Sequence, residues 1–163
     1  MRFVITLDAD TVLPRGAAAR LIGTLAHPLN QTEFEPNTGR VVAGYTIIQP
    51  RLETSPESSR RSPLTRIYCG DTAIDIYSRA VSDVYQDLFG TGIYVGKGIY
   101  DVTAFSRSLA DRVPLGAILS HDLFEGMHGD VALATDIVLY EDYPSTYLAF
   151  TRRLSRWVRG DWQ

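Results

Sequence analysis

The sequence predicts an α/β domain in which a mixed, mostly parallel sheet is flanked by helices. Two observations predict this class: apolar, β-branched segments of strand length alternate with amphipathic segments of helix length, and 45% of the residues are hydrophobic. A chain of 163 residues is about the size of one domain, and this composition suffices for a real core. We therefore expect residues 1–163 to form a single domain.

The first half of the chain predicts two strands and one helix. Residues 2–7 are short, apolar and β-branched, which is typical of a buried strand. Residues 14–26 place apolar side chains on one helical face after a proline, and residues 40–49 have the composition of a second strand. Residues 28–39 and 51–63 are polar and lack a period, so we expect loops there, the second of them mobile.

The second half alternates in the same way. Residues 74–88 carry a helical apolar stripe, whereas residues 90–105 combine strand character with glycine turns. A helix is expected over residues 121–128 after a serine N-cap, followed by a buried strand at 136–140. Residues 145–158 are amphipathic with helical spacing.

Charge and composition exclude several classes of protein. The net charge of −3 and the charged fraction of 21% are those of neither a basic nucleic-acid-binding protein nor a disordered acidic tail. Cys69 is the only cysteine, so an internal disulfide is impossible and a reducing compartment is expected. The chain has no signal-peptide pattern, and no apolar run approaches the ~20 residues that span a bilayer.

A pair of carboxylates follows the first predicted strand. Asp8 and Asp10 stand at its carboxyl end, where open α/β sheets bind their ligands. Two unpaired carboxylates repel, and Mg²⁺ or Mn²⁺ bound by one or two carboxylates relieves this while also binding substrate phosphates. The alternative is that both aspartates only cap the helix that follows.

A third candidate acidic residue, Asp122, stands at a predicted helix start. The helix dipole stabilises a carboxylate there, which is a sufficient structural role. If Asp122 faces a cleft, it can instead remove a proton from an acceptor hydroxyl. His121 beside it has no second metal ligand at a convincing spacing.

Three side chains near the C-terminus share one helical face. Arg153, Arg156 and Trp157 stand at i, i+3 and i+4. Arginine donates forked hydrogen bonds to a pyrophosphate, and tryptophan offers a flat surface for a sugar ring. The structural alternatives are a solvated amphipathic helix and a helix on a membrane surface.

The same residues are compatible with two alternative functions. The strand followed by Asp8 and Asp10 resembles the first motif of haloacid-dehalogenase-like phosphatases, with Asp8 as nucleophile and Asp10 as acid, and residues 70–75 resemble their last motif. In that family the lysine precedes the last motif, whereas Lys97 follows it here, so this alternative ranks second. The other alternative is a catalytically inactive module that docks on a membrane or a partner.

Taken together, the motifs resemble one enzyme family. Asp8-Ala9-Asp10, His121-Asp122 and Arg153-x-x-Arg156-Trp157 resemble the motifs of processive, membrane-bound inverting glycosyltransferases, which include cellulose synthase. More narrowly, the chain resembles the glycosyltransferase domain of bacterial cyclic β-1,2-glucan synthases. The stretches that carry this resemblance are residues 6–14, 80–89, 96–102, 119–123 and 156–163.

The resemblance implies a GT-A-type fold, here in part, and a role for each motif. Asp8 and Asp10 would hold Mg²⁺ or Mn²⁺ on the diphosphate of UDP-glucose, and Asp122 would be the general base for the acceptor hydroxyl. Attack opposite the leaving group would invert the donor linkage and extend a β-1,2-glucan.

The remaining positions are assigned to the donor and the acceptor. Arg156, with Arg153, would bind the donor diphosphate, whereas Trp157 and His121 would line the acceptor side. Lys97 stands between two glycines, which let the backbone approach a ligand closely. It is either a phosphate or substrate contact, which we assign to the acceptor side, or a plain turn residue. Arg153 stands where the wider family has glutamine, and His121 where it often has glutamate.

The resemblance also implies partners and a location. The family's catalytic domain begins upstream with strands that hold the uridine, so we expect residues 1–163 to be the metal- and acceptor-side part of a larger enzyme, with little activity alone. The expected partners are UDP-glucose, the glucan acceptor, the rest of the parent membrane enzyme and the membrane surface near the C-terminal helix, with no nucleic acid. The expected location is the cytoplasmic face of the bacterial inner membrane.

Overall fold

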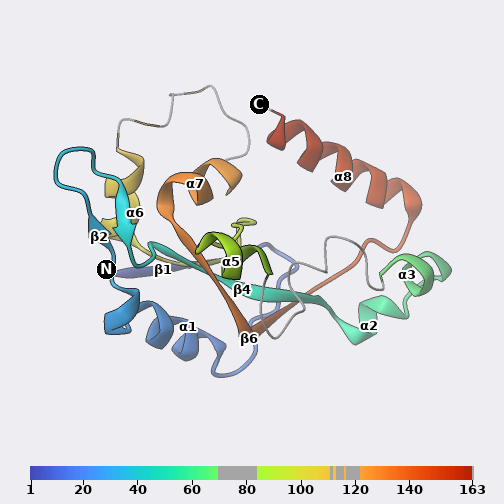
Figure 1. Ribbon diagram of the computed structural model, residues 1–163. Helices are drawn as coiled ribbons and strands as arrows, with labels where there is room; N and C mark the ends of the chain where they lie inside the picture. The colour runs from blue at the N-terminus through green and yellow to red at the C-terminus, as the bar shows by residue number, and fades with distance from the viewer. Residues whose placement is uncertain (70–83, 111, 113–115, 117–121, 163) are drawn as a thin grey trace.

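The strands that the structure describes form one central sheet and one small hairpin. The computed structural model describes residues 1–69, 84–110, 112, 116 and 122–162 (Figure 1). In the central sheet the strand order is β1 (Phe3–Thr6), β5 (Gly98–Asp101), β4 (Ile47–Thr54) and β6 (Val131–Glu141). Strand β5 is antiparallel to both neighbours, and β4 is parallel to β6. The predicted mixed sheet is therefore confirmed, but the prediction that it is mostly parallel was wrong: among the described strands of this sheet, β4 and β6 alone pair in parallel.

Helices cover both faces of this sheet. Ile47 and Ile48 are adjacent on β4, so their side chains point to opposite faces. Ile48 packs with α1 (Ala17–Leu25), and Ile47 packs in a second cluster that includes Phe105 of α6 (Val102–Leu109). Helix α7 (Asp122–Gly129) lies on the Ile47 side of the sheet, opposite α1 (Figure 1). The predicted α/β class with flanking helices is confirmed.

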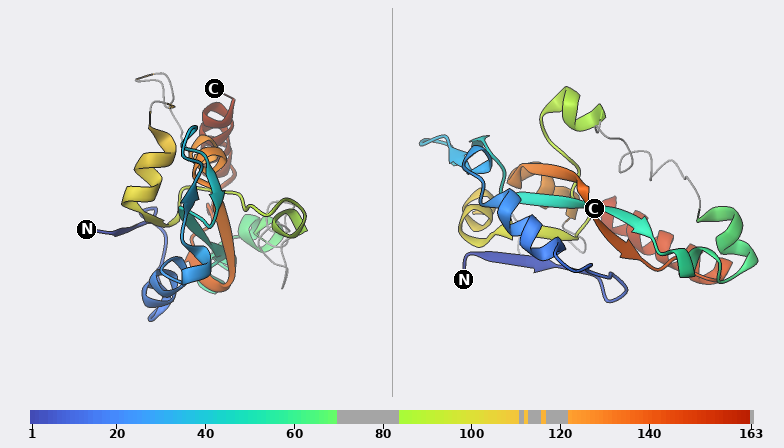
Figure 2. Two further views of the ribbon diagram at one scale, coloured as in Figure 1. Left: turned by 60° about the vertical axis from the view of Figure 1, so that its left-hand side comes forward. Right: turned by 90° about the horizontal axis from the view of Figure 1, so that it is seen from below.

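The other elements lie around this core. They are the 3₁₀ turn η1 (Pro28–Asn30), the hairpin strands β2 (Glu33–Phe34) and β3 (Val41–Ala43), and the helices α2 (Pro56–Ser59), α3 (Pro63–Tyr68), α5 (Val84–Phe89) and α8 (Tyr147–Asp161). Figure 2 shows β2 and β3 at one end of the molecule and α2 and α3 at the other. Among the described helices, none is long and apolar enough to cross a membrane.

Two predictions in the first half of the chain were wrong. The strand expected over residues 40–49 is broken at Gly44, whose φ of 71° lies in the left-handed region. The loop expected over residues 51–63 instead contains the end of β4, helix α2 and the start of α3. Polar residues form this end of β4 because the strand pairs with β6 as far as Thr54↔Glu141.

Further along the chain, the prediction for residues 90–105 missed a helix. Strand β5 ends at Asp101, and its carboxylate accepts hydrogen bonds from the backbone N–H groups of Thr103 and Ala104, at 3.1 Å each. This N-cap starts α6 at Val102. The expected loop 28–39 also contains η1 and β2. Residues 74–83 of the predicted helical stripe and the predicted serine N-cap at 120 lie outside the described residues.

The direction of the strands determines where the site lies. Because β5 is antiparallel to both β1 and β4, strands β1, β4 and β6 run in the same direction and end at one edge. Strand β5 begins at that edge. The residues after β1 and β6 and the residue before β5 therefore meet there.

Candidate functional site

Five ionic side chains from four segments form a continuous chain of ion pairs at this edge. Lys97 Nζ lies 2.9 Å from Asp8 Oδ2 and 3.3 Å from Glu141 Oε1. Arg153 Nη2 lies 3.5 Å from Glu141 Oε2, and Arg153 Nη1 lies 3.7 Å from Asp10 Oδ2. We call Asp8, Asp10, Lys97, Glu141 and Arg153 the charge cluster.

The loop after β1 presents the two aspartates. The backbone N–H of Thr11 donates to the carbonyl oxygen of Asp8 at 3.1 Å, which forms a turn. An antiparallel bridge between Val12 and Tyr140, with N–O distances of 2.7 and 3.2 Å, then fixes the loop to β6. The side chains of Asp8 and Asp10 remain 51% and 41% exposed, so both carboxylates can meet a ligand from solvent.

Lys97 is the buried cation of the cluster, with only 7% of its side chain exposed. Burial of a charged group is costly unless opposite charges compensate it. Asp8 and Glu141 supply that compensation from two different strand ends. The sequence assigned Lys97 to the acceptor side, and the structure places its ammonium group directly against Asp8.

Glu141 is the member of the cluster that the sequence analysis missed. It is the last residue of β6, its side chain is 13% exposed, and its Oε1 also accepts a hydrogen bond from Thr11 Oγ1 at 3.0 Å. The available signal was an acidic pair, Glu141-Asp142, directly after the strand predicted over residues 136–140. Asp8 and Asp10 follow the first predicted strand in the same way.

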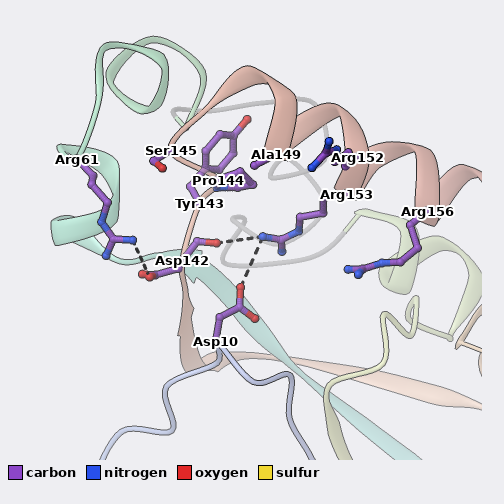
Figure 3. Close-up of a pocket in the computed structure, with 10 residues that line it drawn as sticks. All are labelled: Asp10, Arg61, Asp142, Tyr143, Pro144, Ser145, Ala149, Arg152, Arg153 and Arg156. Carbon is purple, nitrogen blue, oxygen red and sulfur yellow. Dashed lines mark hydrogen bonds and ion pairs between the residues drawn. The ribbon is translucent and has the colours of Figure 1, made fainter.

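Helix α8 forms one wall of an adjoining pocket of about 540 Å³ (Figure 3). Its lining includes Asp10 and Asp142 together with the arginines Arg61, Arg152, Arg153 and Arg156. We call this cavity the arginine pocket, after the four arginine side chains that line it. Arg153 Nη1 donates to the carbonyl oxygen of Asp142 at 3.0 Å, and Arg61 Nη1 pairs with the Asp142 carboxylate at 3.0 Å. The pocket therefore presents several guanidinium groups beside Asp10.

Trp157 lies on the same helix, next to the cluster. The guanidinium carbon of Arg153 is 4.6 Å from the centre of the Trp157 ring, which is a cation–π distance. The residue remains 39% exposed. Trp157 thus supports Arg153 and still offers aromatic surface to solvent.

Asp122 is the first residue of α7 and packs against the backbone just before Lys97. A Cβ atom on Gly96 would lie 2.8 Å from Asp122 Oδ2. Nearby, Tyr94 is 4% exposed, and burial is the largest cause that raises its pKa to about 12, with smaller contributions from Glu125 and Asp122. The Tyr94 hydroxyl therefore stays neutral and shares a 3.1 Å hydrogen bond with Thr6 Oγ1.

The structure thus brings most of the predicted site residues to one edge. Asp8, Asp10, Lys97 and Arg153 belong to the charge cluster, Arg156 lines the arginine pocket, Trp157 contacts Arg153, and Asp122 lies beside Gly96. His121 lies outside the described residues, as do Asp71 and Asp75 of the phosphatase-like motif.

The donor set of Asp8 and Asp10 fits a hard divalent cation. Within the described ranges, no group of three or more His, Cys, Asp or Glu side chains could hold a metal ion. Mg²⁺ does not need such a group, because it commonly takes one or two carboxylates together with phosphate oxygens and water. Both carboxylates are partly exposed, and Asp10 lines the arginine pocket, so the pair matches that requirement. In this structure each carboxylate pairs with a protein cation through Oδ2.

Comparison with known proteins supports the resemblance found in the sequence. No protein-family model matches the chain. The chain is 46% identical over 164 aligned residues to the cyclic beta-(1,2)-glucan synthase NdvB of Rhizobium meliloti (strain 1021). The alignment covers 100% of this chain and 6% of that relative. The chain is therefore homologous, along its whole length, to a segment of a cyclic β-1,2-glucan synthase.

Proposed function

We propose that this chain is the metal- and acceptor-side part of an inverting glycosyltransferase that transfers glucose from UDP-glucose to a growing β-1,2-glucan. The observation that carries the proposal is the convergence of the charge cluster and the arginine pocket at the edge where three strands end. The homology to a glucan synthase supports the same chemistry. In this proposal the sheet belongs to a GT-A-type fold.

The arginine pocket is the proposed site of the donor diphosphate. Arg153 and Arg156 would donate to its oxygens, because guanidinium groups match phosphate geometry and stay charged. Asp8 and Asp10 would hold Mg²⁺ or Mn²⁺ beside these two arginines. The bound cation would neutralise charge on the departing diphosphate.

Asp122 is the proposed general base. Its carboxylate would take the proton of an acceptor hydroxyl, and that oxygen would form a bond to C1 of glucose. The C1–O bond to UDP would break on the opposite face, and UDP would leave with the electron pair. An α-linked donor would thereby give a β-linked product.

Trp157 would contact the acceptor chain, because its exposed ring offers a flat apolar face to a sugar. His121, next to Asp122 in sequence, remains a proposed acceptor contact. The burial of Lys97 against Asp8 favours a role in orienting the metal-holding carboxylate over direct contact with the acceptor.

The parent assembly is part of the proposal, since the chain spans only 6% of the relative that it matches. We propose that the segment works within a larger enzyme at the cytoplasmic face of the bacterial inner membrane. Exposed apolar residues at both ends of α8 support a nearby membrane surface: Tyr147 is 69% exposed and Trp162 is 87% exposed. The same observation favours the docking module as a second candidate function.

Calorimetric titration with UDP and UDP-glucose, with and without Mn²⁺, tests the proposal. We expect Mn²⁺-dependent binding by the native chain and at least a ten-fold loss in Asp10→Ala. Asp136→Ala is the matched control, because Asp136 is an exposed aspartate on β6 that pairs with Arg20 away from the arginine pocket. Equal affinities for Asp10→Ala and Asp136→Ala would contradict the assignment of Asp10.

The other functions give different results in parallel assays. Hydrolysis of an aryl phosphate that is abolished by Asp8→Asn would favour the phosphatase. Binding to anionic liposomes without any affinity for UDP would favour the docking module.

A further inference from the structure

Glu141 connects the two protein cations that pair with the proposed metal-holding carboxylates. Its Oε1 lies 3.3 Å from Lys97 Nζ, and its Oε2 lies 3.5 Å from Arg153 Nη2. Lys97 also pairs with Asp8, and Arg153 also pairs with Asp10. Glu141 is thus the shared anion between two otherwise separate ion pairs.

We propose that Glu141 is a positioning residue that holds Lys97 and Arg153 so that Asp8 and Asp10 can accept a divalent cation. The inference rests on the proposed metal site and adds to it a residue outside the motifs of the sequence. Glu141 would act through Lys97 and Arg153, without touching the metal or the donor.

Glu141 matters for metal binding because the protein cations and an incoming metal ion compete for the carboxylates of Asp8 and Asp10. Any cation that enters between Asp8 and Asp10 must displace or share the ammonium and guanidinium groups already paired with them. Glu141 offers both groups an alternative anion within pairing distance, so their release needs little movement. Without that charge, Lys97 and Arg153 would pair more strongly with Asp8 and Asp10 and would compete with the metal.

The position of Glu141 is fixed independently of its charge. The backbone N–H of Ser55 donates to the carbonyl oxygen of Glu141 at 2.9 Å, and Glu141 stands in register with Thr54 of β4. Thr11 Oγ1 donates to Oε1 at 3.0 Å. Glu141→Gln retains an oxygen for Thr11 and the strand pairing, so this variant removes the charge with little change of shape.

Loss of the negative charge of Glu141 should weaken the binding of Mn²⁺ but should not weaken the binding of pyrophosphate. Neutralising Glu141 makes the cluster less negative, so Mn²⁺ affinity falls, whereas metal-free affinity for an anion does not. We expect Glu141→Gln to bind Mn²⁺ about 10-fold to 100-fold more weakly than the native chain, as is typical of residues that support metal ligands. Its affinity for inorganic pyrophosphate without metal should be equal or higher. A purely structural defect would lower both.

Titration of Mn²⁺ alone and of pyrophosphate alone, followed by calorimetry, tests this inference. Glu141→Asp restores the charge and should recover part of the Mn²⁺ affinity. Glu33→Gln removes an exposed carboxylate on β2 and should behave like the native chain.

The outcomes separate this inference from the proposed function. Native Mn²⁺ affinity in Glu141→Gln would overturn the role of Glu141 and leave the metal site standing. A parallel loss of Mn²⁺ and pyrophosphate binding would also overturn it, because it would show a structural role. Failure of the native chain to bind Mn²⁺, both alone and together with UDP, would overturn the metal site, and this inference with it.

Discussion

Gly96 determines how closely Asp122 approaches the charge cluster. Its φ of 84° lies in the left-handed region, and a Cβ atom there would lie 2.8 Å from Asp122 Oδ2. We expect Gly96→Ala to lower the free energy of unfolding through both backbone strain and this contact, with the strain alone costing about 1–3 kcal/mol. Urea unfolding followed by circular dichroism measures the change.

Gly90→Ala is the matched control for this prediction. Gly90 has a similar φ of 72°, but an added Cβ would meet nothing within 4 Å. Gly90→Ala should therefore show only the backbone cost, and Gly96→Ala should exceed it. Equal losses in the two variants would mean that Asp122 moves away from Gly96 without cost.

Single residues also show what the sequence could reveal of the site. Asp8 and Asp10 were recognisable because they directly follow an apolar strand, and Arg153 and Arg156 because helical spacing places them on one face. Glu141 has a similar local signal, but its role depends on contacts with residues that are distant in the sequence, which no motif reveals. Its partner Thr11 is 130 positions away, and the bridge between Val12 and Tyr140 brings the two segments together.

At the scale of elements, the N-cap of α8 supports the wall of the arginine pocket. Thr146 Oγ1 accepts a hydrogen bond from the backbone N–H of Ala149 at 3.3 Å. Thr146→Ala leaves this N–H without its cap and should cost about 1 kcal/mol of stability. Thr146→Ser keeps the hydroxyl and is the control. Thermal unfolding measures both, and an equal loss in the serine variant would show that the methyl group matters instead of the cap.

Elements with a clear apolar period were predictable, and polar elements were not. Helix α1 was found because Leu21 and Leu25, both buried, recur on one face. The charges at the end of β4 predict a loop, yet Arg51 and Glu53 pair with each other at 2.7 Å while their backbones pair with β6. Helices α2 and α3 start with Ser-Pro caps at Ser55 and Ser62, which is a start signal of short helices without an apolar period.

At the scale of the whole molecule, the reversed direction of β5 completes the site. Three strands end at the site edge, and an antiparallel strand between β1 and β4 must begin there, which places Lys97 beside Asp8. Sequence periodicity shows that strands exist but carries no information about their order in the sheet. The α/β class was therefore predictable, whereas the contact between Lys97 and the residues after β1 and β6 was not.

Ile99 tests how far the site depends on the packing of this sheet. It is fully buried on β5, in register with Ile5 of β1 and Ile48 of β4. Ile99→Ala leaves a cavity between α1 and the sheet and should lower the free energy of unfolding by about 2–5 kcal/mol. Ile67→Ala on α3, where the side chain is 73% exposed, should change it by less than about 0.5 kcal/mol.

The Ile99→Ala substitution should lower stability without changing the affinity for Mn²⁺. The substitution removes no side chain of the charge cluster, and the backbone pairing of β5 with both neighbours remains. At a temperature where circular dichroism shows the variant folded, we therefore expect its Mn²⁺ affinity to equal that of the native chain, while its urea midpoint is lower. A folded Ile99→Ala that binds Mn²⁺ ten-fold more weakly would instead mean that core packing sets the position of Lys97, because β5 is the strand that follows it directly.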